Sequence, residues 1–411
     1  MTVSADSSMA GVAPVATDGF WAAFATRGAR VLLALWLVVA AAGGWGVVQR
    51  LLEGHEGAGY GSYVPWGLWV AMYFHLVGLA GGCFVLGALG FVLRWRGFEG
   101  PAALRTAIVL SIALILPAFL GVWLDLGRLE RAYRIFTSPS FTSMMAFNAW
   151  MYSAFLIVAI IALWLTLRPD SGWLRPLLVL GATLSIAFPS QSGAFFGVVD
   201  AKPYWHSALL PFLFLTSAIV AGSAVLLFVR ALQGRSTFAV WDVGVRDDWE
   251  CAVARLRVVV FAGVLAYLAL EFAELSIGFW SPVADAPGLE LVLWGPYWWV
   301  FWIVHLLLGA AVPLVLLALR RPVLWTVAAG LVAAAFVSAR LNILVPGQTL
   351  SELGGLTAAF VHERLVFDYE ATLEEYLVAL FLVAAAAALF VVGAWAVAAV
   401  RRRLSGTGGA A

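Results

Sequence analysis

Long apolar runs alternate with short polar links along almost the whole chain. Ten runs reach the length of about 20 residues that a membrane-spanning helix needs. We predict spans at roughly 30–48, 64–93, 106–124, 148–167, 175–198, 207–230, 257–280, 297–319, 323–345 and 376–400. The pattern predicts an all-α polytopic protein of the lipid bilayer. Its parts are an N-terminal tail at 1–29, a ten-helix domain at 30–400 and a C-terminal tail at 401–411.

Composition supports a membrane protein and excludes several other classes. Of the 411 residues, 63% are hydrophobic, and the mean hydropathy of +0.97 is too high for a soluble domain. The net charge of +1 gives no indication of a nucleic-acid partner. The two cysteines are too few for an iron–sulfur cluster or a zinc site. If electrons pass through this protein, we therefore expect another protein or a small molecule to carry them.

Basic residues predict the orientation of the spans. Loops on one side of the predicted membrane carry 17 arginines, and loops on the other side carry 6 basic residues. By the positive-inside rule, the first side and both termini are cytoplasmic. Arg128, Arg131 and Arg134, half of the six outer residues, occur in the stretch "GVWLDLGRLERAYRIFTSPSFTSMMAFNAW" at 121–150. Such a concentrated exception indicates a function for this stretch. The outer links at 281–296 and 346–375 are predicted to form short structured caps.

A weak internal repeat is visible in the second and sixth spans. Phe74 and Gly82 align without a gap with Phe214 and Gly222. The alignment predicts two parallel-repeat four-helix bundles, formed by spans 2–5 and 6–9, with spans 1 and 10 flanking them. Small residues at regular spacing are also a common helix-packing device, so packing alone is a second explanation.

Polar side chains inside spans are the candidates for function, because ionisable groups are unfavourable in lipid. All of them are predicted in the outer half of the membrane or near its middle. They are His75, Asp125, Gln191, Glu271, Glu274, His305, Arg340 and Asn342. Structural explanations stay open for some of them. Glu271 and Arg340 are compatible with a buried ion pair, Asp125 and Arg128 with a helix-end pair, and His305 with a hydrogen-bonded packing residue.

The chemistry of this set suits a quinone. A quinone enters laterally from lipid and needs hydrogen-bond donors for its two carbonyl oxygens. Its reduction takes up two electrons and two protons, which a histidine or a buried carboxylate can supply. The sequence therefore predicts a quinone pocket that opens toward the outer side.

Several segments resemble a known family. They are "WGLWVAMYFHLVGLAGG" (66–82), "LDLGRLERAYRIF" (124–136), "SMMAFNAWMYS" (143–153), "SGAFFGVVDAKPYWHSALLPFLFLTSAIVAG" (192–222) and "ARLNILVPG" (339–347). The chain resembles the NrfD/PsrC quinone-interacting membrane subunits, in particular their ten-helix branch. One departure is Leu129, which stands where the family usually has proline.

The resemblance implies a subunit that exchanges electrons between the membrane quinone pool and an external iron–sulfur subunit, with proton transfer as an accompanying role. It implies menaquinone or ubiquinone as the cofactor and no haem or iron–sulfur cluster in the chain itself. The implied partners are a ferredoxin-like iron–sulfur subunit on the outer face and a further catalytic subunit, with molybdopterin or another cofactor. The implied location is the cytoplasmic membrane of a bacterium or archaeon.

The resemblance also implies roles for individual residues. The residues expected to act in catalysis and proton transfer are His75, Asp125, Glu271 and Glu274. Those expected to bind the quinone are His75, Arg128, Gln191, His305, Arg340 and Asn342. Within these sets Asp125 is the relay to the outside and Arg340 the counter-charge of the carboxylates. Arg131 and Arg134 are expected to contact the external partner.

Two other functions remain as alternatives from the sequence. A secondary transporter would also have ten spans, a parallel repeat and buried charges, but we see no span clearly interrupted by glycine or proline at its middle. A cytochrome b-like haem anchor would use His75 and His305 as ligands, although two haems need four ligands.

Overall fold

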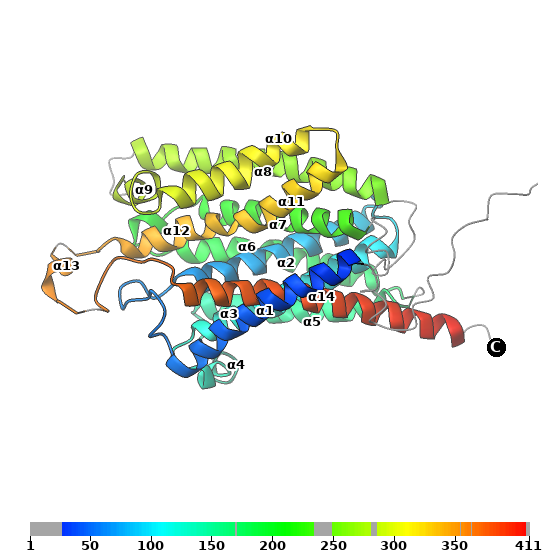
Figure 1. Cartoon of the computed structure of the whole chain (residues 1–411), viewed down its shortest axis with the longest axis horizontal. Helices are drawn as coiled ribbons and strands as arrows, with labels where there is room; N and C mark the ends of the chain where they lie inside the picture. Colours follow the sequence, from blue (N-terminus) through cyan, green and yellow to red (C-terminus); the bar gives the residue numbers. More distant parts are fainter. Residues whose placement is uncertain are drawn as a thin grey trace, which may run out of the picture.

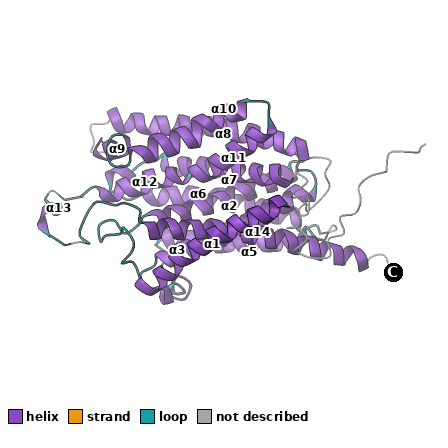
Figure 2. Cartoon of the chain, in the orientation of Figure 1, coloured by secondary structure: helices purple, strands orange, loops and turns teal. Residues whose placement is uncertain are grey.

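The fold is a bundle of long helices that run along one common direction (Figure 1). The computed structural model describes residues 27–168, 171–233, 249–280, 286–353, 355–362 and 364–407. In this part of the chain ten helical spans are long and apolar enough to cross a membrane. Helices and loops account for all of the described residues, without strands (Figure 2). The prediction of ten spans and an all-α fold is therefore confirmed.

The spans begin and end close to the predicted positions. The first seven are single helices: α1 (Arg27–Glu53), α2 (Leu68–Val92), α3 (Pro101–Asp125), α5 (Met144–Leu165), α6 (Leu174–Gly197), α7 (Leu210–Gln233) and α8 (Trp249–Trp280). Span eight consists of η6 (Val300–Ala311) and α10 (Val312–Ala318), span nine of α11 (Pro322–Ala335) and α12 (Val337–Thr349), and span ten is α14 (Leu373–Thr407). Helix α14 continues beyond 400 into the predicted C-terminal tail. Residues 1–26 and 408–411 of the predicted tails lie outside the described residues.

The two ends of the bundle differ in the elements that they carry. Helix α3 has Arg105 near its start and Asp125 at its last position, so we call the two ends the Arg105 end and the Asp125 end. Short elements lie at the Asp125 end: η2 (Leu129–Arg131), α4 (Arg134–Thr137), η3 (Pro203–Trp205), α9 (Ala286–Leu293) and α13 (Leu356–Ala359). Figure 1 shows α13 beyond the helix ends on the left. The predicted caps thus contain short helices, while 281–285 lies outside the described residues.

Helix α2 is the centre of the bundle. It packs against α3, α6 and α7, while α7 packs in turn against α8 and α11. Residues that the sequence repeat aligns with each other are in contact where α2 packs against α7. The rings of Phe74 and Phe214 lie 6.0 Å apart, and a Cβ built on Gly82 would stand 2.9 Å from the Cα of Gly222. Contacts between equivalent positions are what a twofold relation produces. The repeat itself remains a prediction.

Spans eight and nine depart from regular α-helix at mid-span. Span nine is interrupted at Phe336, between the end of α11 and the start of α12. Phe336 keeps helical dihedral angles and its N–H donates to the carbonyl of Val332 at 3.1 Å, so this is a local distortion without glycine or proline. Element η6 is a π-helix, a rare form that occurs frequently at functional sites. Both irregular segments face the polar residues described next.

Candidate functional site

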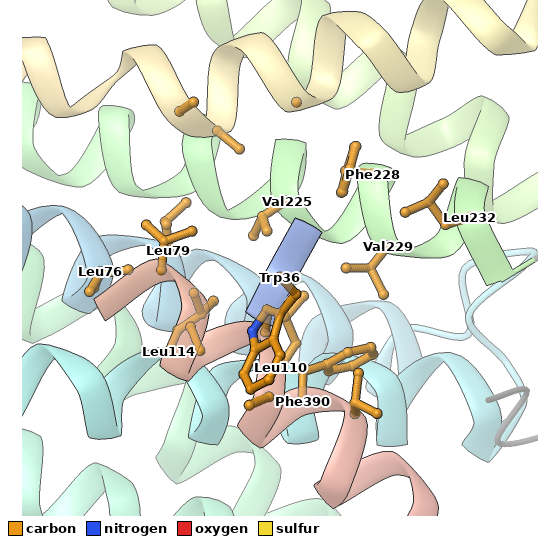
Figure 3. A pocket seen from close by; sticks show the side chains of 18 of the residues that line it. Trp36, Leu76, Leu79, Leu110, Leu114, Val225, Phe228, Val229, Leu232 and Phe390 are labelled. Atoms are coloured by element: carbon orange, nitrogen blue, oxygen red, sulfur yellow. The ribbon is translucent and has the colours of Figure 1, made fainter. Parts of the chain in front are cut away.

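His75 is one of the residues that line a large apolar cavity. The cavity has a volume of about 790 Å³ and is lined by side chains of α1, α2, α3, α7, α11 and α14. Figure 3 shows its aliphatic and aromatic lining, with Trp36 in the middle of the view. At its rim Leu32 and Leu37 of α1 are about half exposed, so the cavity opens toward lipid. We call it the His75 cavity. It reaches Gln233 at the Arg105 end, which differs from the expected outward-opening pocket.

His75 is the buried histidine of this cavity. Its Nε2 lies 2.7 Å from the carbonyl oxygen of Ala333, near the end of α11. Because a carbonyl can only accept, Nε2 must carry the hydrogen, and in the neutral ring Nδ1 is then an acceptor. No described residue forms a hydrogen bond with Nδ1. The ring therefore has one nitrogen fixed by the protein and one available to a ligand about 10 Å below the start of α2.

A second polar network lies between α8, η6 and α12. His305 is fully buried, and its Nε2 lies 3.0 Å from the carboxylate of Glu271. Its Nδ1 lies 3.1 Å from the hydroxyl of Ser338. The Tyr267 hydroxyl donates to the same carboxylate at 3.2 Å. Glu271 thus pairs with His305, and not with Arg340 as one sequence-based explanation proposed.

The hydrogen bonds of Ser338 fix where the proton of this pair lies. Its hydroxyl donates its single hydrogen to the carbonyl of Ala335 at 2.5 Å. The hydroxyl oxygen can then only accept from Nδ1–H of His305, so Nδ1 is protonated. The remaining proton is shared between Nε2 and the carboxylate of Glu271. The pair holds either imidazolium with carboxylate or imidazole with carboxylic acid.

A small cavity lies beside this pair. It has a volume of about 120 Å³, and Glu271, Glu274, His206 and Asn342 are among its lining residues. Glu274 accepts a hydrogen bond from Ser207 at 2.8 Å. Asn342 is 7% exposed, and neither atom of its side-chain amide has a partner among the described residues. We call this space the Glu271 cavity.

Arg340 lies on the other side of α12. Its guanidinium donates to the carbonyl of Phe214 at 3.1 Å and stands 3.9 Å over the ring of that residue. It lies beside Gly78 of α2, where a Cβ would be 3.4 Å from its Nη2. No described carboxylate is within 4.0 Å of it, so the expected role as a direct counter-charge has no geometric support. Arg340 instead places a buried cation between α2 and α7.

Asp125 belongs to a third group, which we call the Asp125 cluster. Arg50 of α1 donates to the carbonyls of Leu124 and Leu126 at 2.6 and 2.9 Å, which suits a cation at a helix C-terminus. Glu375 of α14 is fully buried. It accepts from the backbone N–H groups of Gly59 and Leu68 at 2.9 and 3.2 Å, and from the Tyr369 hydroxyl at 2.5 Å. These bonds join the ends of α1, α2, α3 and α14.

Two loop side chains of this cluster, Tyr60 and His55, have shifted pKa values. Burial raises the pKa of Tyr60 well above its usual value, and the negative charges of Asp125 and Glu375 add to the shift. Burial lowers the pKa of His55, and the charge of Arg50 lowers it further. Tyr60 therefore keeps its hydrogen and His55 is neutral around pH 7. Both are neutral groups beside Asp125, and each is able to donate a hydrogen bond to a carboxylate.

Two predicted residues lie apart from the cavities. Arg128 has a side chain that is 69% exposed and lies 3.9 Å from Glu130, so it does not line the mouth of a pocket. The cation beside Asp125 is Arg50, not Arg128. Gln191 is half-buried in α6 and lines neither the His75 cavity nor the Glu271 cavity. Arg131 and Arg134 are exposed, as a role in partner contact requires.

The geometry also bears on haem binding. Both nitrogens of His305 are hydrogen-bonded within the protein, so a haem ligand there would have to displace Glu271 or Ser338. His75 and His305 lie in different groups of residues, on opposite sides of α12. They do not face a common space that could hold one iron between them.

Sequence reasoning missed the residues that orient the site. Ser338, Tyr267 and Glu375 all hold a predicted site residue or the helix that carries it. Serine and tyrosine are ordinary inside spans and give no pattern of their own. The pair Glu374–Glu375 at the start of α14 did carry information, because two adjacent acids precede a span without a basic neighbour.

The fold and these cavities define a class: a multi-pass membrane protein with a lateral apolar chamber that has a histidine in its lining. The model of the family described as "Polysulphide reductase, NrfD" matches residues 58–352. The match covers α2 to α12, including His75, Asp125 and Asn342. The chain therefore belongs to the NrfD family, as its motifs predict.

Curated relatives agree with this assignment. The chain is 25% identical to the C subunit of selenate reductase from Mesobacillus selenatarsenatis, over 80% of this chain and 84% of the relative. It is 27% identical to the Hdr-like menaquinol oxidoreductase integral membrane subunit of Archaeoglobus fulgidus, over 88% and 91%. It is 28% identical to a Halobacterium salinarum protein named as a membrane subunit of dimethyl sulfoxide reductase, over 72% and 71%. By these names, the relatives are subunits of reductases or oxidoreductases, and two of them are membrane subunits.

Proposed function

We propose that this protein is the quinone-reactive membrane subunit of a multi-subunit oxidoreductase complex. The observation that supports this most is the His75 cavity, an apolar chamber of about 790 Å³ that opens toward lipid and has a buried histidine in its lining. Such a chamber is mostly apolar with few polar groups, as small-molecule sites usually are. The relative named as a menaquinol oxidoreductase subunit supports a quinone as the ligand.

The residues of the chamber have separate roles in this proposal. The apolar walls from α1, α7 and α14 hold the isoprenoid tail. His75 uses Nε2–H to fix its ring on Ala333 and offers Nδ1 to a quinol hydroxyl, from which it can accept a proton. In the reverse direction, protonated Nδ1 donates to a quinone carbonyl. A bound quinone supplies the two-electron chemistry.

Electrons must leave toward partners that the chain does not contain. We propose that a ferredoxin-like iron–sulfur subunit docks at the Asp125 end and that the complex includes a further catalytic subunit. Exposed Arg131 and Arg134 lie at that end. Asp125, with neutral Tyr60 beside it, is proposed to pass protons to the same side. The proposed setting is the cytoplasmic membrane of a bacterium or archaeon, with this end outside.

Quinone binding by the full chain tests the proposal. A fluorescent or inhibitory menaquinol analogue should bind the detergent-solubilised protein, and His75→Ala should weaken binding at least tenfold. The matched control is His362→Ala, because His362 is exposed in the loop after α13, and it should bind as the unchanged protein does. Absence of binding to the unchanged protein, or equal binding by His75→Ala, would overturn the proposal.

A further inference from the structure

Helix α12 presents different polar side chains on two of its faces. Ser338 and Asn342 are four residues apart and share one face, which is turned to His305 and the Glu271 cavity. Arg340 lies about 200° around the helix from Ser338. Its face is turned to α2 and α7, where it contacts Phe214. Residues of α12 line the Glu271 cavity but not the His75 cavity, and the two cavities share no lining residue.

The unpaired amide of Asn342 indicates what occupies the Glu271 cavity. Asn342 is 7% exposed, and both Nδ2 and Oδ1 lack partners among the described residues. A buried amide in this state needs a ligand that can accept and donate hydrogen bonds. The volume of about 120 Å³ is room for about four waters at about 30 Å³ each. It is too small for a quinone ring with its tail, so water is the ligand that fits.

We propose that the Glu271 cavity is a water chamber through which the Glu271–His305 pair exchanges its proton with the aqueous phase at the Asp125 end. The exchangeable proton is the one shared by Nε2 and the carboxylate, because Nδ1–H is fixed on Ser338. It passes to a chamber water and leaves as hydronium, and the pair regains a proton by the reverse step. His206, whose side chain is 57% exposed, lines the chamber and marks its outlet.

Several charged or titratable groups surround the pair and belong to this account. On α8, Tyr267 bonds the carboxylate and Glu274 lies one turn further on, where it binds Ser207. Tyr204 and His206, from η3 and the loop after it, line the chamber. Arg340 on α12 is turned away from the chamber. At the outlet His206 lies 3.1 Å from Asp200, and no arginine or lysine is among the residues that line the chamber.

This inference does not depend on quinone chemistry, so it is tested separately. Infrared difference spectra of the full chain between H₂O and D₂O, recorded in reconstituted membranes, contain a carboxyl–imidazole contribution from the pair. That contribution is identified as the part lost in Glu271→Gln. We expect it to exchange rapidly when H₂O is replaced by D₂O, and Asn342→Leu to slow the exchange at least tenfold, because an apolar side chain displaces the water.

Two further variants make the result decisive. Asn342→Ala enlarges the chamber and should keep the exchange rapid, so slow exchange in Asn342→Leu alone shows blockage and not misfolding. Asn148→Leu is the matched control, because Asn148 is also buried with an unpaired side-chain oxygen but lies in α5. Unchanged exchange in Asn342→Leu, or an unchanged spectrum in Glu271→Gln, would overturn the proposal. Neither result would alter the binding test at His75.

Discussion

The two cavities differ in almost every property except the presence of a histidine. The His75 cavity is large, apolar and open toward lipid, whereas the Glu271 cavity is small and polar, with an exposed histidine at its mouth. In the first, the protein leaves one histidine nitrogen without a partner among the described residues. In the second, both nitrogens of His305 are bonded. The comparison shows that two buried histidines at similar depth can have different roles. What distinguishes them is whether a ring nitrogen is left unbonded by the protein and whether the surroundings are apolar or polar.

The largest effect is expected from a change at the start of α2, the helix that carries His75. Glu375→Ala removes the acceptor for the N–H groups of Gly59, in the loop after α1, and of Leu68, the first residue of α2. Because hydrogen bonds to a charged group contribute about 1.5–3 kcal/mol each, we expect a loss of about 2–4 kcal/mol of stability. Thermal unfolding of the solubilised chain would show it as a lower midpoint, together with weaker quinone binding.

Glu53→Ala is the control for this change, because Glu53 is exposed at the end of α1. The infrared exchange at Glu271 should persist in Glu375→Ala below its unfolding temperature. A midpoint equal to that of Glu53→Ala would show that the Asp125 cluster does not hold α2.

A smaller effect is expected from filling the apolar cavity. Val225 of α7 lines the His75 cavity, and Val225→Trp would place an indole in the space proposed for the quinone. Excess volume in a packed site is unfavourable by about 1–3 kcal/mol, so binding of a quinone analogue should weaken about tenfold or more. Val225→Ile is the conservative control. Undiminished binding by the tryptophan variant would place the quinone elsewhere.

The next test asks whether the two cavities influence each other across α12. Arg340 is a buried charged residue of α12, so a double-mutant cycle of Glu271→Gln and Arg340→Leu is informative. Coupling between distinct sites is typically about 1–3 kcal/mol, and we expect the lower end. Glu271→Gln should change quinone affinity about fivefold with Arg340 present and little without it. Equal changes in both backgrounds would show that the cavities act independently.

The smallest effect concerns an ion pair outside both cavities. Lys202 and Glu352 lie 2.6 Å apart at the Asp125 end. Burial alone would raise the pKa of Glu352, but the hydrogen bond and charge of Lys202 outweigh it, so the pKa is lowered. A lowered pKa in the folded state gives stability that is present at neutral pH and lost as the pH falls through that pKa.

We therefore expect Glu352→Gln to reduce stability by less than about 1 kcal/mol at neutral pH. The difference from the unchanged protein should disappear on acidification, when Glu352 itself is protonated. Unfolding midpoints at several pH values would show this, with exposed Glu99→Gln as the control. A difference that persists in acid would mean that the pair is not electrostatic in origin.

The sequence allowed the fold to be predicted far better than the site. Each apolar run long enough to span a bilayer became a helix, because in lipid the backbone has few other ways to satisfy its hydrogen bonds. The local distortion at Phe336 has no sequence signal, because neither glycine nor proline stands there. There the last turn of α11 offers carbonyls of Ala333 and Ala335 to the side chains of His75 and Ser338. That arrangement depends on residues far apart in the chain.

The candidate residues were found, but their grouping was not. Depth along a span can be estimated from the sequence, whereas direction around the helix axis depends on neighbours that pack against it. His75, Asp125 and Glu271 were therefore assigned to one pocket, and the structure divides them among two cavities and a cluster. Arg340 was assigned to the carboxylates because its charge suggests them. The packing of α12 turns it to α2 and α7 instead.

The π-helix η6 has a consequence for insertions and deletions. His305 meets Glu271 and Ser338 only in the register that this wide helix provides. Removing one residue between Val300 and the histidine would rotate the imidazole by roughly a quarter of a turn, away from both partners, without changing any side chain of the network. The number of residues in this segment is therefore as much a part of the proton site as Glu271 itself. Relatives with a gap here would keep the same residues and lose the pair.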